Sequence, residues 1–100
     1  MKIMFTLSDQ IEDELRDAEK YIDCAYAKKD EYPELAATYL RLSKEEIAHA
    51  NAIHEQVTKI IETYKQSNEV PQHMKAFYDY LHSKYVDWAL KIELKQKNFK

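Results

Sequence analysis

The amino-acid sequence predicts an all-α domain in which an antiparallel helical hairpin is followed by a third helix. The chain has 100 residues, which is one domain at most, and it contains no Gly and only two Pro. Sheets and tight hairpins rely on Gly at turn positions with positive φ, so its absence favours long helices with few connections. Apolar residues make up 45% of the chain, which permits a core, although so short a chain buries only a modest one alone.

Composition excludes several classes of function. The chain carries 15 basic and 18 acidic residues, a net charge of −3, which gives no basic footprint for nucleic acid. No stretch approaches the roughly 18 apolar residues of a membrane span, and the apolar run at the N-terminus is too short for a signal peptide. The single cysteine, Cys24, excludes an intrachain disulfide and a Cys-x-x-Cys metal site. We therefore expect a soluble, cytoplasmic protein that binds neither nucleic acid nor membrane.

The first helix is expected over about residues 8–29. Thr6 or Ser8 can cap its N-terminus, and Lys28 and Lys29 suit its C-terminus. Its apolar residues recur at alternating steps of four and three, at Ile11, Leu15, Ala18, Ile22 and Ala25. This is helical spacing, and it predicts one buried face.

The second helix is expected over about residues 33–66, with Pro33 in its first turn, and the third over about 71–95, with Pro71 at its start. One face of the second helix carries Leu35, Tyr39, Leu42, Glu46, His49, Ile53, Ile60 and Tyr64. The third helix is apolar on one face at Met74, Phe77, Leu81, Tyr85, Trp88 and Ile92, and on its other side at Tyr78, Val86 and Leu90. A helix that is apolar on two sides commonly packs on two neighbours, so we expect a second copy of the chain to complete a four-helix bundle.

Two polar residues interrupt the apolar face of the second helix. Glu46 and His49, within the segment EEIAH, are three residues apart and point in neighbouring directions. Burying a carboxylate is costly unless it is paired or bound to metal, and a divalent cation accepts both carboxylate and imidazole ligands. The alternative is an intrahelical Glu–His pair that faces water or caps a polar layer of the core.

The first helix offers a matching strip. Glu12, Glu19 and Tyr26 are seven residues apart, and Glu19 lies at the edge of the predicted core. One chain would then supply Glu19, a bridging Glu46 and a terminal His49, which is half of a carboxylate-bridged two-metal site. A two-fold axis would complete that site. The alternatives are an exposed role for Glu19 and a core role for Tyr26.

These residues resemble the first half of a ferritin or rubrerythrin site, with Glu19 and Tyr26 followed by the EExxH box at residues 45–49. Residues 33–57 most closely resemble the second helix of the encapsulated ferritin-like proteins, short chains that are similar to half a ferritin. The resemblance covers roughly residues 12–60. It implies a ferritin-like bundle whose di-iron centre is rebuilt between two subunits.

The resemblance also implies roles for single residues. Glu19, Glu46 and His49 would be iron ligands, and Tyr26 would be a hydrogen-bonded tyrosine near the centre. Glu12, one strip-length before Glu19, is a further candidate by its position, as a carboxylate through which metal enters the site. The implied activity is that of a ferroxidase, which oxidises Fe(II) with dioxygen or peroxide in iron storage or in protection from oxidative stress. Two Fe per dimer are expected, and Mn accepts the same ligands.

The chain departs from the family in its C-terminal part. The third helix does not match, residues 91–100 contain no clear docking tail for an encapsulating shell, and rubredoxin-like cysteines are absent. Two other functions therefore stay open, a non-catalytic oligomerisation or adaptor protein and a metal carrier without turnover. The Asp79-x-x-His82 pair is a disfavoured candidate for a degenerate second half-site, because Asp is shorter than Glu and His82 lies off the main stripe. His54 is expected to be a flanking polar residue.

Overall fold

The computed structural model describes residues 2–67 and 72–100, apart from three side chains, those of Ser67, His73 and Met74. The helix start expected at Pro71 and the place expected for the Met74 side chain lie outside the described residues. Within the two described ranges every element is an α-helix and no strand occurs, so the predicted all-α class is confirmed.

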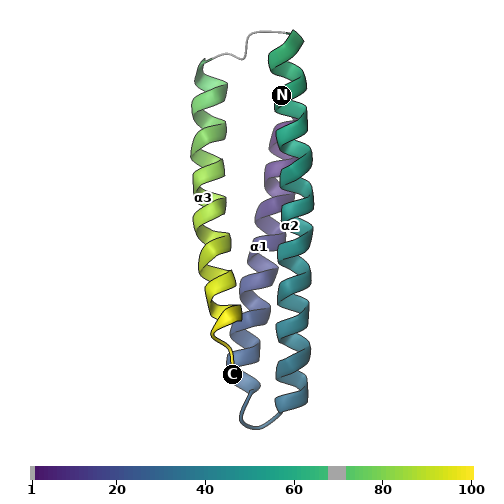
Figure 1. Ribbon diagram of the computed structural model, residues 1–100, viewed down its shortest axis with the longest axis vertical. Helices are drawn as coiled ribbons and strands as arrows, with labels where there is room; N and C mark the ends of the chain where they lie inside the picture. The colour runs from purple at the N-terminus through teal and green to yellow at the C-terminus, as the bar shows by residue number, and fades with distance from the viewer. Residues whose placement is uncertain (1, 68–71) are drawn as a thin grey trace.

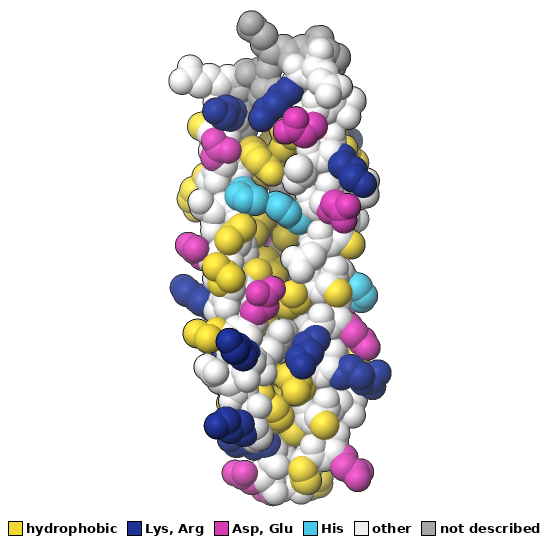
Figure 2. Space-filling view, viewed as in Figure 1, with side chains coloured by type: hydrophobic (Ala, Val, Ile, Leu, Met, Phe, Trp, Pro, Cys, Tyr) yellow, Lys and Arg dark blue, Asp and Glu magenta, His cyan; other side chains and the backbone are white. Residues whose placement is uncertain are grey.

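Three helices run side by side along a molecule that is 56 Å long (Figure 1). They are α1 (Lys2–Lys28), α2 (Pro33–Ser67) and α3 (Gln72–Lys97). α2 runs antiparallel to α1, which confirms the predicted hairpin, and α3 runs antiparallel to α2. Figure 2 shows apolar side chains along the seam between α3 and α2, with charged side chains on either side. Over the described residues, none of the helices combines the length and the hydropathy that crossing a membrane requires.

α1 begins six residues earlier than expected, at Lys2, which corrects its predicted start near residue 8. Met4 is buried and lies seven residues before Ile11, so the apolar stripe extends toward the N-terminus and holds this segment on the core. The hydroxyl of Thr6 donates to the carbonyl of Lys2 at 3.4 Å, which is a bond inside a helix and not an N-cap. Ser8 is likewise internal to α1.

The core is built on the predicted stripe of α1. All five residues of that stripe are buried. They pack with residues of the other two helices, Ile47, Ala50, Val57, Ile61, Tyr85 and Ile92. α1 and α2 contact each other along most of their length, whereas α3 contacts α1 less and α2 least. The hairpin is therefore the more tightly packed unit.

A buried chain of hydrogen bonds joins all three helices. The Ser43 hydroxyl on α2 donates to the Ala18 carbonyl on α1 at 2.7 Å, and the Gln96 amide on α3 donates to the Ser43 hydroxyl at 2.8 Å. Buried polar groups cost free energy unless they are hydrogen-bonded, and here each finds a partner. This link therefore fixes the three helices relative to one another.

Candidate metal centre

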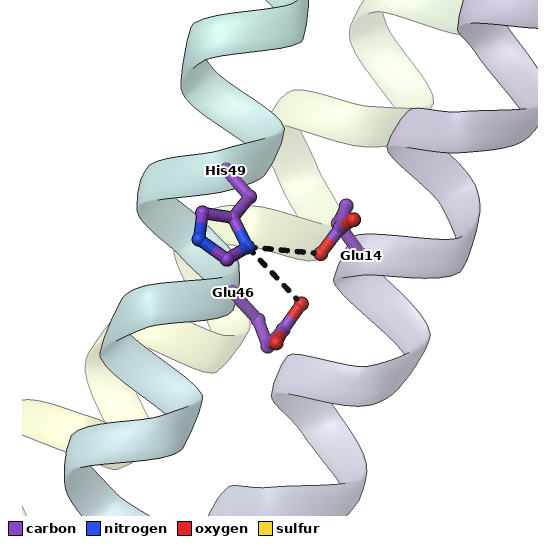
Figure 3. A group of neighbouring side chains, drawn as sticks. All are labelled: Glu14, Glu46 and His49. Atoms are coloured by element: carbon purple, nitrogen blue, oxygen red, sulfur yellow. Dashed lines mark ion pairs between the residues drawn. The ribbon is translucent and has the colours of Figure 1, made fainter.

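Three potential metal ligands meet between α1 and α2. His49 Nδ1 lies 3.4 Å from Glu14 Oε2 and 3.6 Å from Glu46 Oε2. One ligand atom from each residue falls within 4.8 Å of the others. Figure 3 shows Glu14 reaching from α1 and the other two from α2, with the two carboxylates and the imidazole directed toward one another. We call Glu14, Glu46 and His49 the carboxylate–histidine cluster.

The helices place these side chains at the edge of the core. Glu14 precedes the buried Leu15, and Glu46 precedes the buried Ile47. The side chains of Glu14 and Glu46 are 27% and 18% exposed, whereas that of His49 is 60% exposed. The two carboxylates are therefore partly withdrawn from water, and the imidazole lies at the outer rim.

Within the described residues, neither Glu14 nor Glu46 is ion-paired with a permanently positive side chain. A hydrogen bond with Glu14, together with burial and the charges of Glu14 and Asp17, raises the pKa of Glu46 to about 7, although His49 acts in the opposite direction. In residues 2–67 and 72–100, the ion-pair partner of both carboxylates is His49, and no Lys or Arg pairs with either. The pair must therefore hold a proton near neutral pH or be neutralised by a cation.

The cluster has the donor set of a divalent metal site. Carboxylate oxygens suit Mn and Mg, and imidazole suits Fe and Zn, so two carboxylates with one imidazole fit Fe(II) or Mn(II). Three protein ligands leave coordination positions open for water, a substrate or further ligands. The residues present thus fit a catalytic or transport metal better than a closed structural one.

The predicted strip of Glu12, Glu19 and Tyr26 exists, but it faces α3. Trp88 Nε1 donates to Glu19 Oε2 at 3.0 Å, and the Tyr26 hydroxyl donates to the carbonyl of Lys95 at 2.8 Å. These contacts use the strip to dock the third helix. In the single chain Glu46 and His49 come together as expected, and Glu19 lies outside their cluster.

Glu12 is neutralised by its own neighbours. Its Oε1 pairs with Arg16 at 2.9 Å, and its Oε2 accepts from the Tyr85 hydroxyl at 3.4 Å. The Tyr85 hydroxyl also donates to the carbonyl of Ser8 at 3.2 Å. Glu12 is thus occupied in helix docking, in contrast to Glu14.

Glu14 is the cluster residue that the sequence analysis missed. It lies two residues after Glu12, about 200° further around α1 at 3.6 residues per turn, and so on the other edge of the buried stripe. The sequence does carry a signal for this edge of α1. Glu14 and Tyr21 are seven residues apart, the same spacing that relates Glu12 to Glu19. Tyr21 stacks on Tyr39 of α2, with ring centroids 6.1 Å apart.

Comparison with protein families, curated proteins and solved structures finds no match to the chain. Its function is therefore inferred from its own side chains.

Proposed function

We propose that the carboxylate–histidine cluster is half of a di-metal centre, and that two copies of the chain join their clusters to form a ferritin-like Fe(II) oxidase. The proposal rests on one observation. Glu14 and Glu46 are partly buried beside the imidazole of His49, and within the described residues no Lys or Arg pairs with either carboxylate. A divalent cation would remove the cost of keeping two carboxylates together.

The ligand pattern supports a shared site. Di-iron helix bundles take one Glu from each of two helices and a Glu-x-x-His from each of the other two. This chain offers Glu14 on α1 and Glu46-x-x-His49 on α2, which is one of each. A two-fold axis through the cluster would supply four carboxylates and two imidazoles.

The position of the cluster leaves room for a second copy. Figure 3 shows the three side chains on the near side of α1 and α2, with α3 behind these helices. The exposed ring of His49 and the 41% exposed Leu35 belong to the same face of α2. A second hairpin packed there would cover Leu35 and His49 and complete the predicted four-helix bundle.

In the proposed reaction, iron would supply the electrons and the side chains of the cluster would hold the ions. Two Fe(II) ions would give up two electrons, which with two protons reduce dioxygen to hydrogen peroxide, or hydrogen peroxide to two waters. Glu14 and Glu46 would hold the ions and balance their charge, and His49 would fix one of them through its ring nitrogen. Iron storage or protection from peroxide in the cytoplasm is the role that fits this reaction.

The proposal is tested by anaerobic titration with Fe(II), followed by native mass spectrometry. We expect a dimer, or a multiple of dimers, that takes up two irons per pair of chains and then consumes oxygen. Glu14→Gln and His49→Ala should each lower iron affinity at least tenfold, because each removes a ligand.

Glu19→Gln is the matched control, because a glutamine oxygen can still accept the hydrogen bond from Trp88. It should bind iron like the unchanged chain. Iron uptake that is lost in Glu19→Gln but kept in Glu14→Gln would contradict the assignment of Glu14 as a ligand. One ion per monomer without oxygen consumption would indicate a carrier, and no uptake at all would favour the adaptor function.

A further inference from the structure

A second group of titratable side chains joins α2 to α3. His54 Nε2 and His82 Nδ1 are 2.8 Å apart, and the two rings lie with centroids 4.7 Å apart. Tyr78 also stacks on His82, at 5.8 Å between ring centroids. Figure 2 shows two histidine side chains touching across the seam between α3 and α2. His54, expected to be a flanking residue, is thus an interhelical contact.

The contact depends on protonation. A hydrogen bond between two imidazole nitrogens needs one N–H and one lone pair, so at least one ring must be neutral. When both rings are protonated, both nitrogens carry hydrogen, and two positive charges lie side by side. Neither ring has an ion-paired carboxylate in the described part of the chain, so nothing there compensates the second charge.

Within the described residues, the charged groups of this region form no ion pair with the two rings. On α1, Glu12 and Asp9 act on Tyr85, three residues after His82, and burial and these carboxylates raise the pKa of Tyr85 to about 12. On α2, the exposed Glu55 pairs with Lys59 at 3.5 Å. On α3, Asp79 is exposed. Tyr85 therefore stays neutral and adds no charge to this seam.

We infer that His54 and His82 form a pH-sensitive latch, which holds the N-terminal half of α3 on α2 while one ring is neutral and releases it when both are protonated. The inference does not depend on the metal centre. Release would begin at this end of α3, because the other end is held by the buried Gln96–Ser43 bond and by the Tyr26 hydroxyl.

The direction of the pH effect follows from His54. Burial, and then the charge of His82, lowers the pKa of His54 from its ordinary value of 6.5, so docked α3 favours the neutral ring. The undocked state takes up protons first as the pH falls. Docking is therefore fully stable above pH 6.5 and weakens below it, by up to about tenfold per pH unit for each proton taken up on release.

Hydrogen–deuterium exchange between pH 8 and pH 5, corrected for the intrinsic pH dependence of exchange, tests the latch. Protection of residues 75–85 should fall below pH 6.5, while residues 11–25 of α1 stay protected. His54→Gln should remove this fall, since an amide can bond to His82 without carrying charge. His82→Phe, which keeps a ring against Tyr78, should reduce the fall without abolishing it, because the charge of His82 is lost while the burial of His54 remains.

His49→Gln is the control, because it removes an imidazole outside the seam, and it should keep the fall in protection. An unchanged pH dependence in both His54→Gln and His82→Phe would overturn the inference. So would constant protection of residues 75–85 in the unchanged chain down to pH 5.

Discussion

At Glu46 a proton and a cation compete for the same carboxylate. The pKa of this group is raised from 4.5 to about 7, chiefly by the hydrogen bond with Glu14. Between pH 4.5 and about 7, the Glu46 carboxyl of the folded chain therefore holds a proton that the same group of the unfolded chain has released. The resulting stability is complete below pH 4.5 and is lost as the pH rises through 7. Metal binding requires the deprotonated carboxylate, so metal affinity should rise over the same interval.

This competition predicts a pH dependence of stability. In a chelator, the free energy of unfolding should fall between pH 5 and pH 8 by about 2 kcal/mol, because one pKa unit is worth about 1.4 kcal/mol and the site is partly open to water. Chemical denaturation at several pH values measures it. Glu46→Gln should flatten this part of the profile, and Glu19→Gln should not. An equal slope in both variants would assign the titration elsewhere.

The identity of Glu14 shows what spacing along a helix can and cannot predict. The buried stripe of α1 from Ile11 to Ala25 was predicted correctly from its periodicity. On α2 the expected face was wrong by about one residue, because Ile47 and Ala50 are buried there and Leu35 is exposed. Both edges of the α1 stripe carry acidic residues, Glu12 and Glu19 on one and Glu14 on the other. Which edge meets α2 and which meets α3 depends on how the helices are arranged in space, and a single helix does not encode this.

At the scale of the elements, contacts between helices are likewise not encoded in the residue pattern of a single helix. The hairpin, the third helix and the pairing of Glu46 with His49 could be predicted, because each rests on local patterns or on residues three apart. The contact between His54 and His82 joins residues 28 apart along the chain, and no local pattern pairs them. The start of α1 was placed too late because Thr6 and Ser8 resemble caps, whereas burial of Met4 extends the helix.

The buried link through Ser43 sets the relation between the three helices. Ser43→Ala should lower the free energy of unfolding by about 1–3 kcal/mol, because it leaves the Gln96 amide and the Ala18 carbonyl without their shared partner. Urea denaturation measures the loss. The double variant Ser43→Ala with Gln96→Leu should recover part of it, since the unsatisfied amide is then gone. Strictly additive losses would show that the two residues are not coupled.

At the scale of the whole molecule, the proposed centre links metal to assembly. Fe(II) or Mn(II) should shift the chain toward dimers, because ligands from two copies would bind the same ions. Sedimentation velocity in chelator and in excess metal, without oxygen, measures the shift. Glu14→Gln should weaken the metal-dependent dimer at least tenfold, and His54→Gln, on the α3 side, should leave it unchanged. A dimer insensitive to metal and to Glu14→Gln would separate assembly from the cluster.

The docking of α3 on the strip of Glu12, Glu19 and Tyr26 also decides which side of α1 the proposed dimer could use. α1 has two flanks beside its buried stripe, and α3 covers one of them through the bonds from Trp88 and Tyr85. In the proposed dimer, the second copy would therefore pack on the flank that carries Glu14. A two-fold contact of this kind would use the same patch on both copies, and such a contact closes on itself. α3 would thus be the partner of one flank of α1, and the second copy would be the partner of the other.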